Sequence, residues 1–165
     1  MEVLHAPWRI QYIMAKKDRD CEGSLFTNIG QSSEDERNHV VARQRHAYAV
    51  LNTYPYNPGH ILVVPYRQVV DLVDLGNDEM LDLMNLVQRC QRALADTMSP
   101  QGVNIGINIG AAAGAGIQEH LHVHIVPRWK GDTNFMPVTA ETRVLSEALD
   151  ETASKLRDAL AAQPS

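Results

Sequence analysis

The feature of this sequence that most constrains its fold is a run of three alternating histidines, His120, His122 and His124. In an extended strand alternate side chains share one face, so successive rings are expected to point the same way and to start about 6 to 7 Å apart. The intervening Leu121 and Val123 offer apolar side chains for the opposite face. The run therefore predicts a strand that directs three imidazoles into one cleft.

Two kinds of chemistry use clustered imidazoles. Burying three titratable rings is unfavourable unless they form hydrogen bonds or bind a ligand, which favours a functional site. A neutral imidazole is a common zinc ligand, although the nearest carboxylate, Glu119, is expected on the opposite face of the strand. Alternatively, a neutral imidazole nitrogen can attack phosphorus and form a covalent nucleotidyl intermediate, provided that an acceptor holds its other nitrogen in the correct tautomer. The residues alone leave a metal site and a nucleotide site open.

The remaining pattern indicates an α+β fold with a largely antiparallel sheet. Short β-favouring runs and turn-rich connections predict strands over residues 40–42, 46–52, 60–65, 103–109 and 120–127. Residues 15–38 are polar and charged, which is typical of loop and short helix. Apolar residues at helical spacing predict a long helix over 77–98 and a C-terminal helix over about 140–162.

Each predicted helix carries an apolar stripe that is expected to face the core. In the long helix the stripe consists of Met80, Leu83, Met84, Val87, Cys90 and Leu94. In the C-terminal helix it consists of Val144, Leu145, Leu149, Ala153, Leu156 and Leu160.

Length and charge narrow the range of partners. The chain of 165 residues fits one compact domain, 1–165. A net charge of −5 gives no basic surface for nucleic-acid backbones but permits a local pocket for a small anionic ligand. No segment approaches the roughly 20 apolar residues of a membrane helix and no signal-peptide pattern begins the chain, so we expect a cytoplasmic protein without membrane contact. In that compartment Cys21 and Cys90 are expected to be thiols.

The segment 118–128, which reads QEHLHVHIVPR, resembles the signature of the histidine triad (HIT) superfamily. Residues 57–65 and 104–110 follow the order and spacing of the same family. The resemblance covers about residues 36–136 and leaves a polar N-terminal segment, 1–35, and the C-terminal helix outside the motif core.

Three further strings, at 7–9, 52–60 and 127–135, resemble a bacterial branch of this superfamily. That branch includes diadenosine tetraphosphate phosphorylases and relatives of the fragile histidine triad hydrolases. The resemblance implies a HIT-like fold, in which an antiparallel sheet of about five strands is combined with one long central helix and a C-terminal helix. It also implies a homodimer, formed through the long helix and a sheet edge, with one nucleotide bound by each protomer.

The resemblance implies unequal roles for the histidines. His122 matches the nucleophile that takes the nucleoside monophosphate group, and His124 matches a contact to the α-phosphate. His120 and His60 match the groups that orient the nucleophile. The other positions that match substrate contacts are Asn52 for the ribose, Leu62 for the base pocket, Asn108 for a phosphate and Gly116 for a phosphate or the leaving group. Turn or edge positions alone would also explain His60, Asn52 and Asn108.

The activity that the resemblance implies is transfer of the α-phosphate of a dinucleoside polyphosphate, such as diadenosine tetraphosphate, through a nucleotidyl-histidine that water or phosphate releases. No cofactor is required, although a divalent cation could accompany the polyphosphate. Hydrolysis of nucleoside phosphoramidates is an alternative within the same chemistry. Gly116 replaces a serine or glutamine common in relatives, which leaves open a nucleotide-binding regulatory protein with little turnover. A metal-binding protein is the third alternative.

Many bacterial members of the family hold zinc with a CxxC pair, a histidine after the proline-ended strand and the first histidine of the triad. Here Ser24 stands where the second cysteine would follow Cys21, and Gln68 stands at the histidine position. Only Cys21 and His120 match, and two ligands cannot complete a four-coordinate structural site. We therefore expect no structural zinc, and hydrogen bonds or packing in its place.

Overall fold

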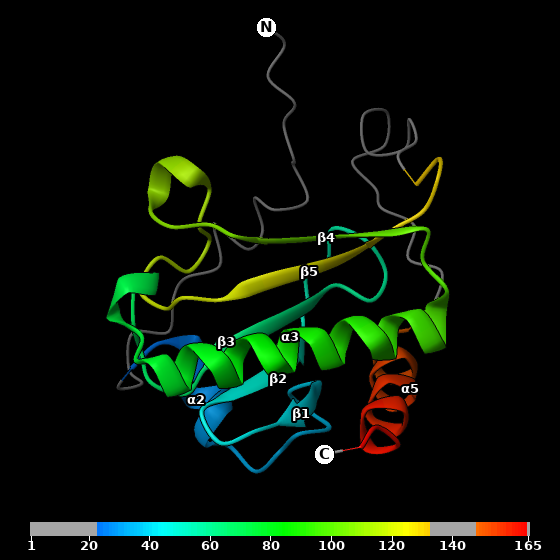
Figure 1. Ribbon diagram of the computed structural model, residues 1–165, viewed down its shortest axis with the longest axis horizontal. Coiled ribbons are helices and arrows are strands. Elements are labelled where there is room, and N and C mark those ends of the chain that lie inside the picture. Colours follow the sequence, from blue (N-terminus) through cyan, green and yellow to red (C-terminus); the bar gives the residue numbers. More distant parts are fainter. Residues whose placement is uncertain (1–22, 133–147, 165) are drawn as a thin grey trace, which may run out of the picture.

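A five-stranded antiparallel sheet with the strand order β1-β2-β3-β5-β4 forms the centre of the computed structural model (Figure 1). The structure describes residues 23–132 and 148–164. The strands are β1 (Val40–Arg43), β2 (Ala47–Leu51), β3 (Ile61–Pro65), β4 (Gly102–Ile107) and β5 (Val123–Arg128). This architecture confirms the predicted α+β fold with an antiparallel sheet.

Three α-helices accompany the sheet: α2 (Leu25–Gln31), α3 (Asn77–Met98) and α5 (Leu149–Ala161). Short 3₁₀ turns, η2 (Leu72–Asp74) and η3 (Ala111–Ala113), lie in the connections. The helix α3 lies across one face of the sheet, and α5 contacts both α3 and β1 (Figure 1). Asp78 and Glu79 favour the start of α3, because acidic side chains stabilise the N-terminal end of a helix dipole.

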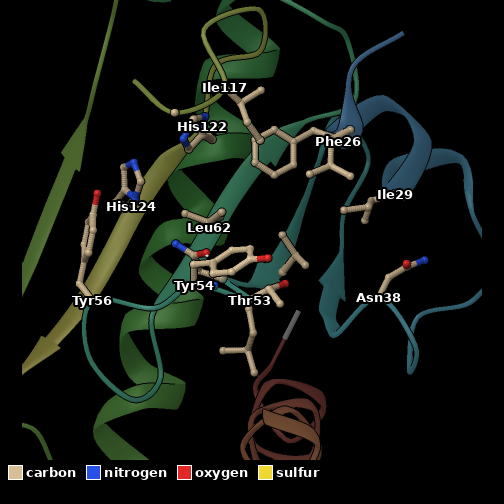
Figure 2. A pocket seen from close by; sticks show the side chains of 15 residues that line it. Phe26, Ile29, Asn38, Thr53, Tyr54, Tyr56, Leu62, Ile117, His122 and His124 are labelled. Atoms are coloured by element: carbon tan, nitrogen blue, oxygen red, sulfur yellow. Dashed lines mark hydrogen bonds between the residues drawn. The ribbon is translucent and has the colours of Figure 1, made fainter. Parts of the chain in front are cut away.

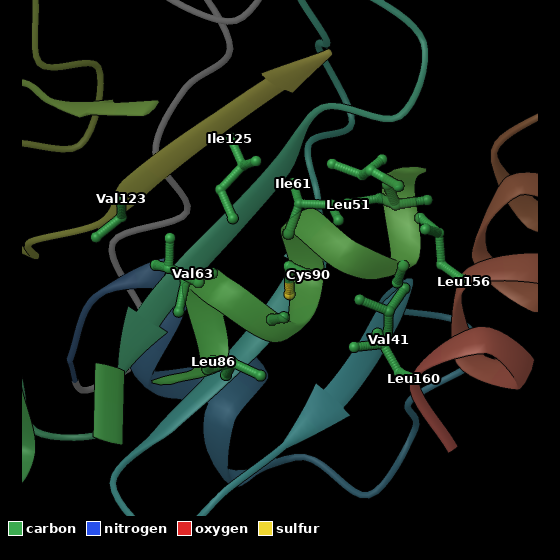
Figure 3. Close-up of a cluster of buried hydrophobic side chains, with 14 of the residues drawn as sticks. Val41, Leu51, Ile61, Val63, Leu86, Cys90, Val123, Ile125, Leu156 and Leu160 are labelled. Atoms are coloured by element: carbon green, nitrogen blue, oxygen red, sulfur yellow. The ribbon is translucent and has the colours of Figure 1, made fainter. Parts of the chain in front are cut away.

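Strand alternation divides the buried side chains between the two faces of the sheet. Ala49 and Leu51 of β2 face α3 in one apolar cluster. Their neighbours Tyr48 and Val50 belong to a second cluster on the other face, together with Phe26 of α2. Figure 3 shows the first cluster, in which strand residues meet side chains from α3 and α5. The first cluster lies under α3, and the second lies on the opposite face of the sheet, where α2 packs.

The buried stripe of α3 differs from the predicted one at Met84, which is 41% exposed. Leu86 and Ala93 are buried instead, beside Leu83, Val87, Cys90 and Leu94. The buried residues are three or four positions apart and therefore share one face of the helix. Met84 directly follows the buried Leu83 in the sequence, so its side chain points away from that face. The prediction that Met84 fills the core was therefore wrong.

The C-terminal helix begins later than predicted. Ala148 has extended backbone angles, with φ −67° and ψ 146°, and it caps the helix that begins at Leu149. The prediction of one continuous helix from residue 140 to residue 162 is therefore wrong, because the chain is extended at Ala148. Its buried residues Ala153, Leu156 and Leu160 agree with the expected stripe. The predicted portion 140–147 lies outside the described residues, as do the strings at 7–9 and 134–135.

The turn before β3 places His60 at the start of that strand. The N–H of His60 donates to the Asn57 carbonyl over 3.2 Å, and the Asn57 amide donates to the Pro127 carbonyl over 2.9 Å. Gly59 has a φ of +76°, a backbone conformation that residues with a Cβ rarely adopt. The turn therefore fixes His60 next to the end of β5.

Within the part of the chain that the structure describes, no helix combines the length and apolar character needed to cross a membrane.

Candidate active site

The ring of His122 is held in one tautomer by the backbone. Its Nδ1 lies 2.9 Å from the carbonyl oxygen of His120. A carbonyl oxygen only accepts hydrogen bonds, so Nδ1 carries the proton and Nε2 keeps its lone pair. Burial lowers the pKa of His122, although the bond to the carbonyl acts in the opposite direction. A neutral imidazole with an accessible lone pair is the form that can attack phosphorus.

His124 is oriented by a chain of donors that begins at the backbone of Tyr56. The Tyr56 N–H donates to His60 Nδ1 over 3.1 Å, so the neutral His60 ring carries its proton on Nε2. That proton is donated to His124 Nδ1 over 3.0 Å. His124 therefore presents Nε2 as a donor, and the Asn52 amide, 3.3 Å from His60 Nδ1, supports the same arrangement.

His120 does not share the surface formed by the other two histidines. Its Nδ1 accepts from Ser24 Oγ over 2.6 Å, and its Nε2 donates to the Pro65 carbonyl over 2.8 Å. Both ring nitrogens are thus used inside the protein, and burial lowers the pKa of His120. Its carbonyl is the acceptor for His122, so it acts on the reaction only through that neighbour.

The prediction of one histidine strand over 120–127 is corrected by this arrangement. The strand β5 begins at Val123, so only His124 of the three lies on it. The N–H of Leu121 donates to the Val69 carbonyl over 2.7 Å, outside the sheet ladder. This bond diverts the chain before the strand, and the rings of His122 and His124 still come within 4.8 Å, centroid to centroid.

A pocket extends from these two rings across the sheet (Figure 2). His122, His124 and Asn52 line one part of it, and the predicted Leu62 and Gly116 also line it. The apolar part is formed by Leu25, Phe26, Ile29, Val50, Leu51, Leu62 and Ile117. A largely apolar pocket with a few convergent polar groups is typical of a small-molecule site.

Asn108 is not brought into this pocket. It follows the end of β4, is half-buried and does not line the cavity with His122. The other seven predicted site residues lie in the pocket or within one hydrogen bond of a residue that lines it.

The aromatic residues that line the pocket, Phe26, Tyr54 and Tyr56, were not predicted as site residues. The ring of Phe26 lies 5.0 Å from that of His122 and 5.7 Å from that of His120. The ring of Tyr56 stacks on His60 at 4.8 Å. Phe26 is the buried residue of α2, and it stands with Leu25 and Ile29 at helical spacing in an otherwise polar stretch of sequence, which is a signal that could have identified it. No sequence pattern predicts that the Tyr56 ring stacks on His60, because this contact depends on the turn between the two residues.

Hydrogen bonds join Ser24, Gln68 and His120, the described positions at which the sequence was compared with a zinc site. Ser24 Oγ donates to His120, and the Ser24 N–H donates to Gln68 Oε1 over 3.2 Å. Thr27 Oγ1 donates to the same Gln68 oxygen over 3.2 Å. Cys21 lies outside the described residues, and among those described no cluster of three histidine, cysteine or acidic side chains could hold a metal ion.

Ser24→Ala is expected to lower the free energy of unfolding by about 1 to 3 kcal/mol, because it leaves the buried His120 Nδ1 without its donor. It also removes the cap that accepts from the Thr27 N–H. Urea denaturation measures the loss, with the exposed Ser33→Ala as the matched control. Ser24→Thr keeps both the hydroxyl donor and the cap acceptor, so it should be less destabilised than Ser24→Ala. Equal stability of the Ser24 and Ser33 variants would contradict the assignment.

Comparison with known proteins identifies the family. The model of the HIT domain family matches residues 33–131. This chain belongs to the HIT domain family. A relative from Mycobacterium tuberculosis (strain ATCC 25618 / H37Rv), named AP-4-A phosphorylase, is 43% identical over 170 residues, which cover 99% of this chain and 87% of the relative.

Other HIT relatives are more distant. The bis(5′-nucleosyl)-tetraphosphatase [asymmetrical] of Schizosaccharomyces pombe is 40% identical over 93 residues, which cover 56% of this chain and 50% of that enzyme. Among solved structures, a Zn-bound histidine triad family protein from Mycobacterium smegmatis has a TM-score of 0.67 and 28% identity. That match covers 84% of this chain and 94% of the other. The named enzymes among these relatives support an enzymatic role for this HIT protein.

Proposed function

We propose that this HIT protein cleaves dinucleoside polyphosphates, with diadenosine tetraphosphate as substrate and inorganic phosphate as acceptor. The observation that carries the proposal is the His122 ring, which lines the pocket with Nδ1 bound to a carbonyl and Nε2 left as the nucleophile. The relative named AP-4-A phosphorylase, which matches 99% of this chain, supports the choice of substrate and acceptor.

The proposed reaction has two displacement steps at the α-phosphorus. In the first step the His122 Nε2 lone pair forms a nitrogen–phosphorus bond, the bond to the bridging oxygen breaks, and ATP leaves with that electron pair. In the second step an oxygen of inorganic phosphate attacks, the nitrogen–phosphorus bond breaks, and ADP is released. The electron pair returns to Nε2, which regenerates the enzyme. Water as the acceptor would give AMP instead.

The groups around His122 fit this reaction. The Nε2–H of His124 is suited to donate to an α-phosphate oxygen as negative charge develops there. Phe26, Ile29 and Leu62 offer apolar contacts to a base, and Asn52 is suited to bind the ribose. Gly116 lines the pocket without a side chain, so only its backbone can contact the leaving group. We infer that any divalent cation enters with the polyphosphate.

The test is to incubate the protein with diadenosine tetraphosphate, with and without inorganic phosphate, and to identify the products by mass. ADP formed only when phosphate is present supports phosphorolysis. AMP formed without phosphate would indicate a hydrolase of the same chemistry. Turnover of an adenosine phosphoramidate but of no dinucleoside polyphosphate would favour the phosphoramidate alternative. Binding of nucleotide without any product would favour the regulatory protein.

The pH dependence of this reaction follows from the state of His122. Protonation of Nε2 removes the lone pair, so kcat/KM falls as the pH drops through the pKa of the ring. Since burial lowers that pKa below the ordinary value of 6.5, kcat/KM is expected to be flat above pH 6.5 and to fall only at lower pH. A pH profile with diadenosine tetraphosphate measures it. An acid limb centred above pH 7 would contradict a neutral, buried nucleophile.

We also propose a cytoplasmic homodimer. Leu81 and Met84 of α3 are 63% and 41% exposed, and β4 lies at the edge of the sheet. Exposed apolar side chains on a helix and an open strand edge are each suited to an interface between two copies. Sedimentation should show a dimer that Leu81→Glu weakens, whereas Asp78→Glu on the same helix should not. A monomeric wild-type protein at micromolar concentration would contradict the dimer.

A further inference from the structure

Asn38 lines the pocket at a distance from the reacting histidines. Figure 2 shows its amide on the opposite side of the pocket from His124, with Leu62 and Tyr54 in between. A nucleotide with its α-phosphate at His122 and its base on the apolar wall would direct the edge of that base towards Asn38. None of the roles implied for the histidines, Asn52 or Leu62 uses this amide.

The orientation of the Asn38 amide is set by its neighbours. Its Nδ2 donates to Ser32 Oγ over 3.1 Å, and the same hydroxyl accepts from the Glu34 N–H over 3.1 Å. The bond to Ser32 takes one of the two N–H donors of Nδ2 and sets the orientation of the amide, which leaves the carbonyl oxygen, Oδ1, as the acceptor that a ligand can use. An amide oxygen only accepts hydrogen bonds.

The loop that carries Asn38 is held in place. The Asn38 N–H donates to the Glu34 carbonyl over 3.0 Å. Arg43 reaches from β1 to the Ser32 carbonyl at 2.8 Å and to Asp35 at 2.6 Å. A charged side chain bonded at several points restricts the loop, so the acceptor can be held in position before a ligand arrives.

We propose that Asn38 Oδ1 accepts a hydrogen bond from the exocyclic N6 amine of adenine, and thereby selects adenine over guanine nucleotides. Adenine presents a donor at its C6 position, whereas guanine presents a carbonyl oxygen there, which an amide oxygen cannot pair with. The apolar wall can pack on either purine, so it does not discriminate between them. This inference rests on the proposed function for the position of the phosphate and names the specificity of that same site.

Binding of mononucleotides tests the inference without requiring turnover. Isothermal titration compares AMP with purine riboside 5′-monophosphate, which lacks only the N6 amine, and with GMP. The unchanged protein is expected to bind AMP about 3- to 10-fold more tightly than the analogue without the amine, the contribution of one neutral hydrogen bond. In Asn38→Leu this ratio should fall to about one. Asn38→Asp keeps an acceptor and should retain the preference.

The control is Asn77→Leu, the same change at an exposed position that does not line the pocket. Its AMP preference should equal that of the unchanged protein. The same ratio in Asn38→Leu as in the unchanged protein would overturn the assignment of Asn38 and leave the proposed function intact. Failure of the unchanged protein to bind any of the three nucleotides would overturn both.

Discussion

Replacing His122 with alanine is expected to reduce diadenosine tetraphosphate cleavage by on the order of 10⁴-fold or more, since the variant has no atom to form the covalent bond. The pocket walls and His124 remain, so AMP should still bind. Steady-state kinetics measures the rate, and isothermal titration with AMP measures the binding.

The control for this experiment is His46→Ala, because His46 is a half-buried histidine that does not line the pocket. This variant should keep the wild-type rate. A His122→Ala protein that folds, binds AMP and retains most of its activity would show that another atom attacks the phosphorus.

Replacing His124 with alanine is expected to lower kcat/KM by about 10²- to 10³-fold, the effect of removing one donor to a developing oxyanion. The bond from His60 makes His124 Nε2 a donor, and no other ring nitrogen of the triad is directed to this task. His124→Gln supplies an amide N–H and should recover part of the loss. If His124→Ala behaved like His46→Ala, the donor role would be wrong.

Much of the framework could be predicted because its determinants are local. The bounds of α3, Asn77–Met98, agree with the prediction, since the acidic residues at its start and the helical apolar spacing lie within the segment and Pro100 closely follows its end. The pairing of β2 with β3 follows from two β-favouring runs joined by a turn-rich connection. At these elements the residue propensities and the spacing of apolar residues both favour the structure that forms.

The arrangement of the histidines depends on distant partners that no local pattern reveals. The period-two spacing predicted one strand with a common face for His120, His122 and His124. Phe26 does contact the rings of both His120 and His122, but the His120 ring is bonded to Ser24 and to the Pro65 carbonyl and does not line the pocket. The spacing therefore did not reveal that the strand begins only at Val123, or that the His120 ring is enclosed by its own hydrogen bonds. The tautomers of the site could not be derived either, because they depend on backbone groups brought close by folding.

The hydrogen bonds around Ser24 could be predicted only in part. The absence of two expected zinc ligands predicted that hydrogen bonds or packing would replace them. The partners of Ser24 are 44 and 96 residues away, at Gln68 and His120, so their geometry had to come from the structure. The hydroxyl of Ser24 donates to His120, and the carbonyl of His120 in turn orients the His122 ring.

The most direct test of a nucleotidyl transfer through His122 is to isolate the intermediate. The protein is mixed with diadenosine tetraphosphate without inorganic phosphate, quenched at alkaline pH, and analysed by intact-protein and peptide mass spectrometry. We predict one adenylyl group per active site, located on His122, that is lost with formation of ADP when phosphate is added before the quench. Release of ATP without any adduct on His122 at the shortest times, or an adduct on another residue, would contradict the mechanism.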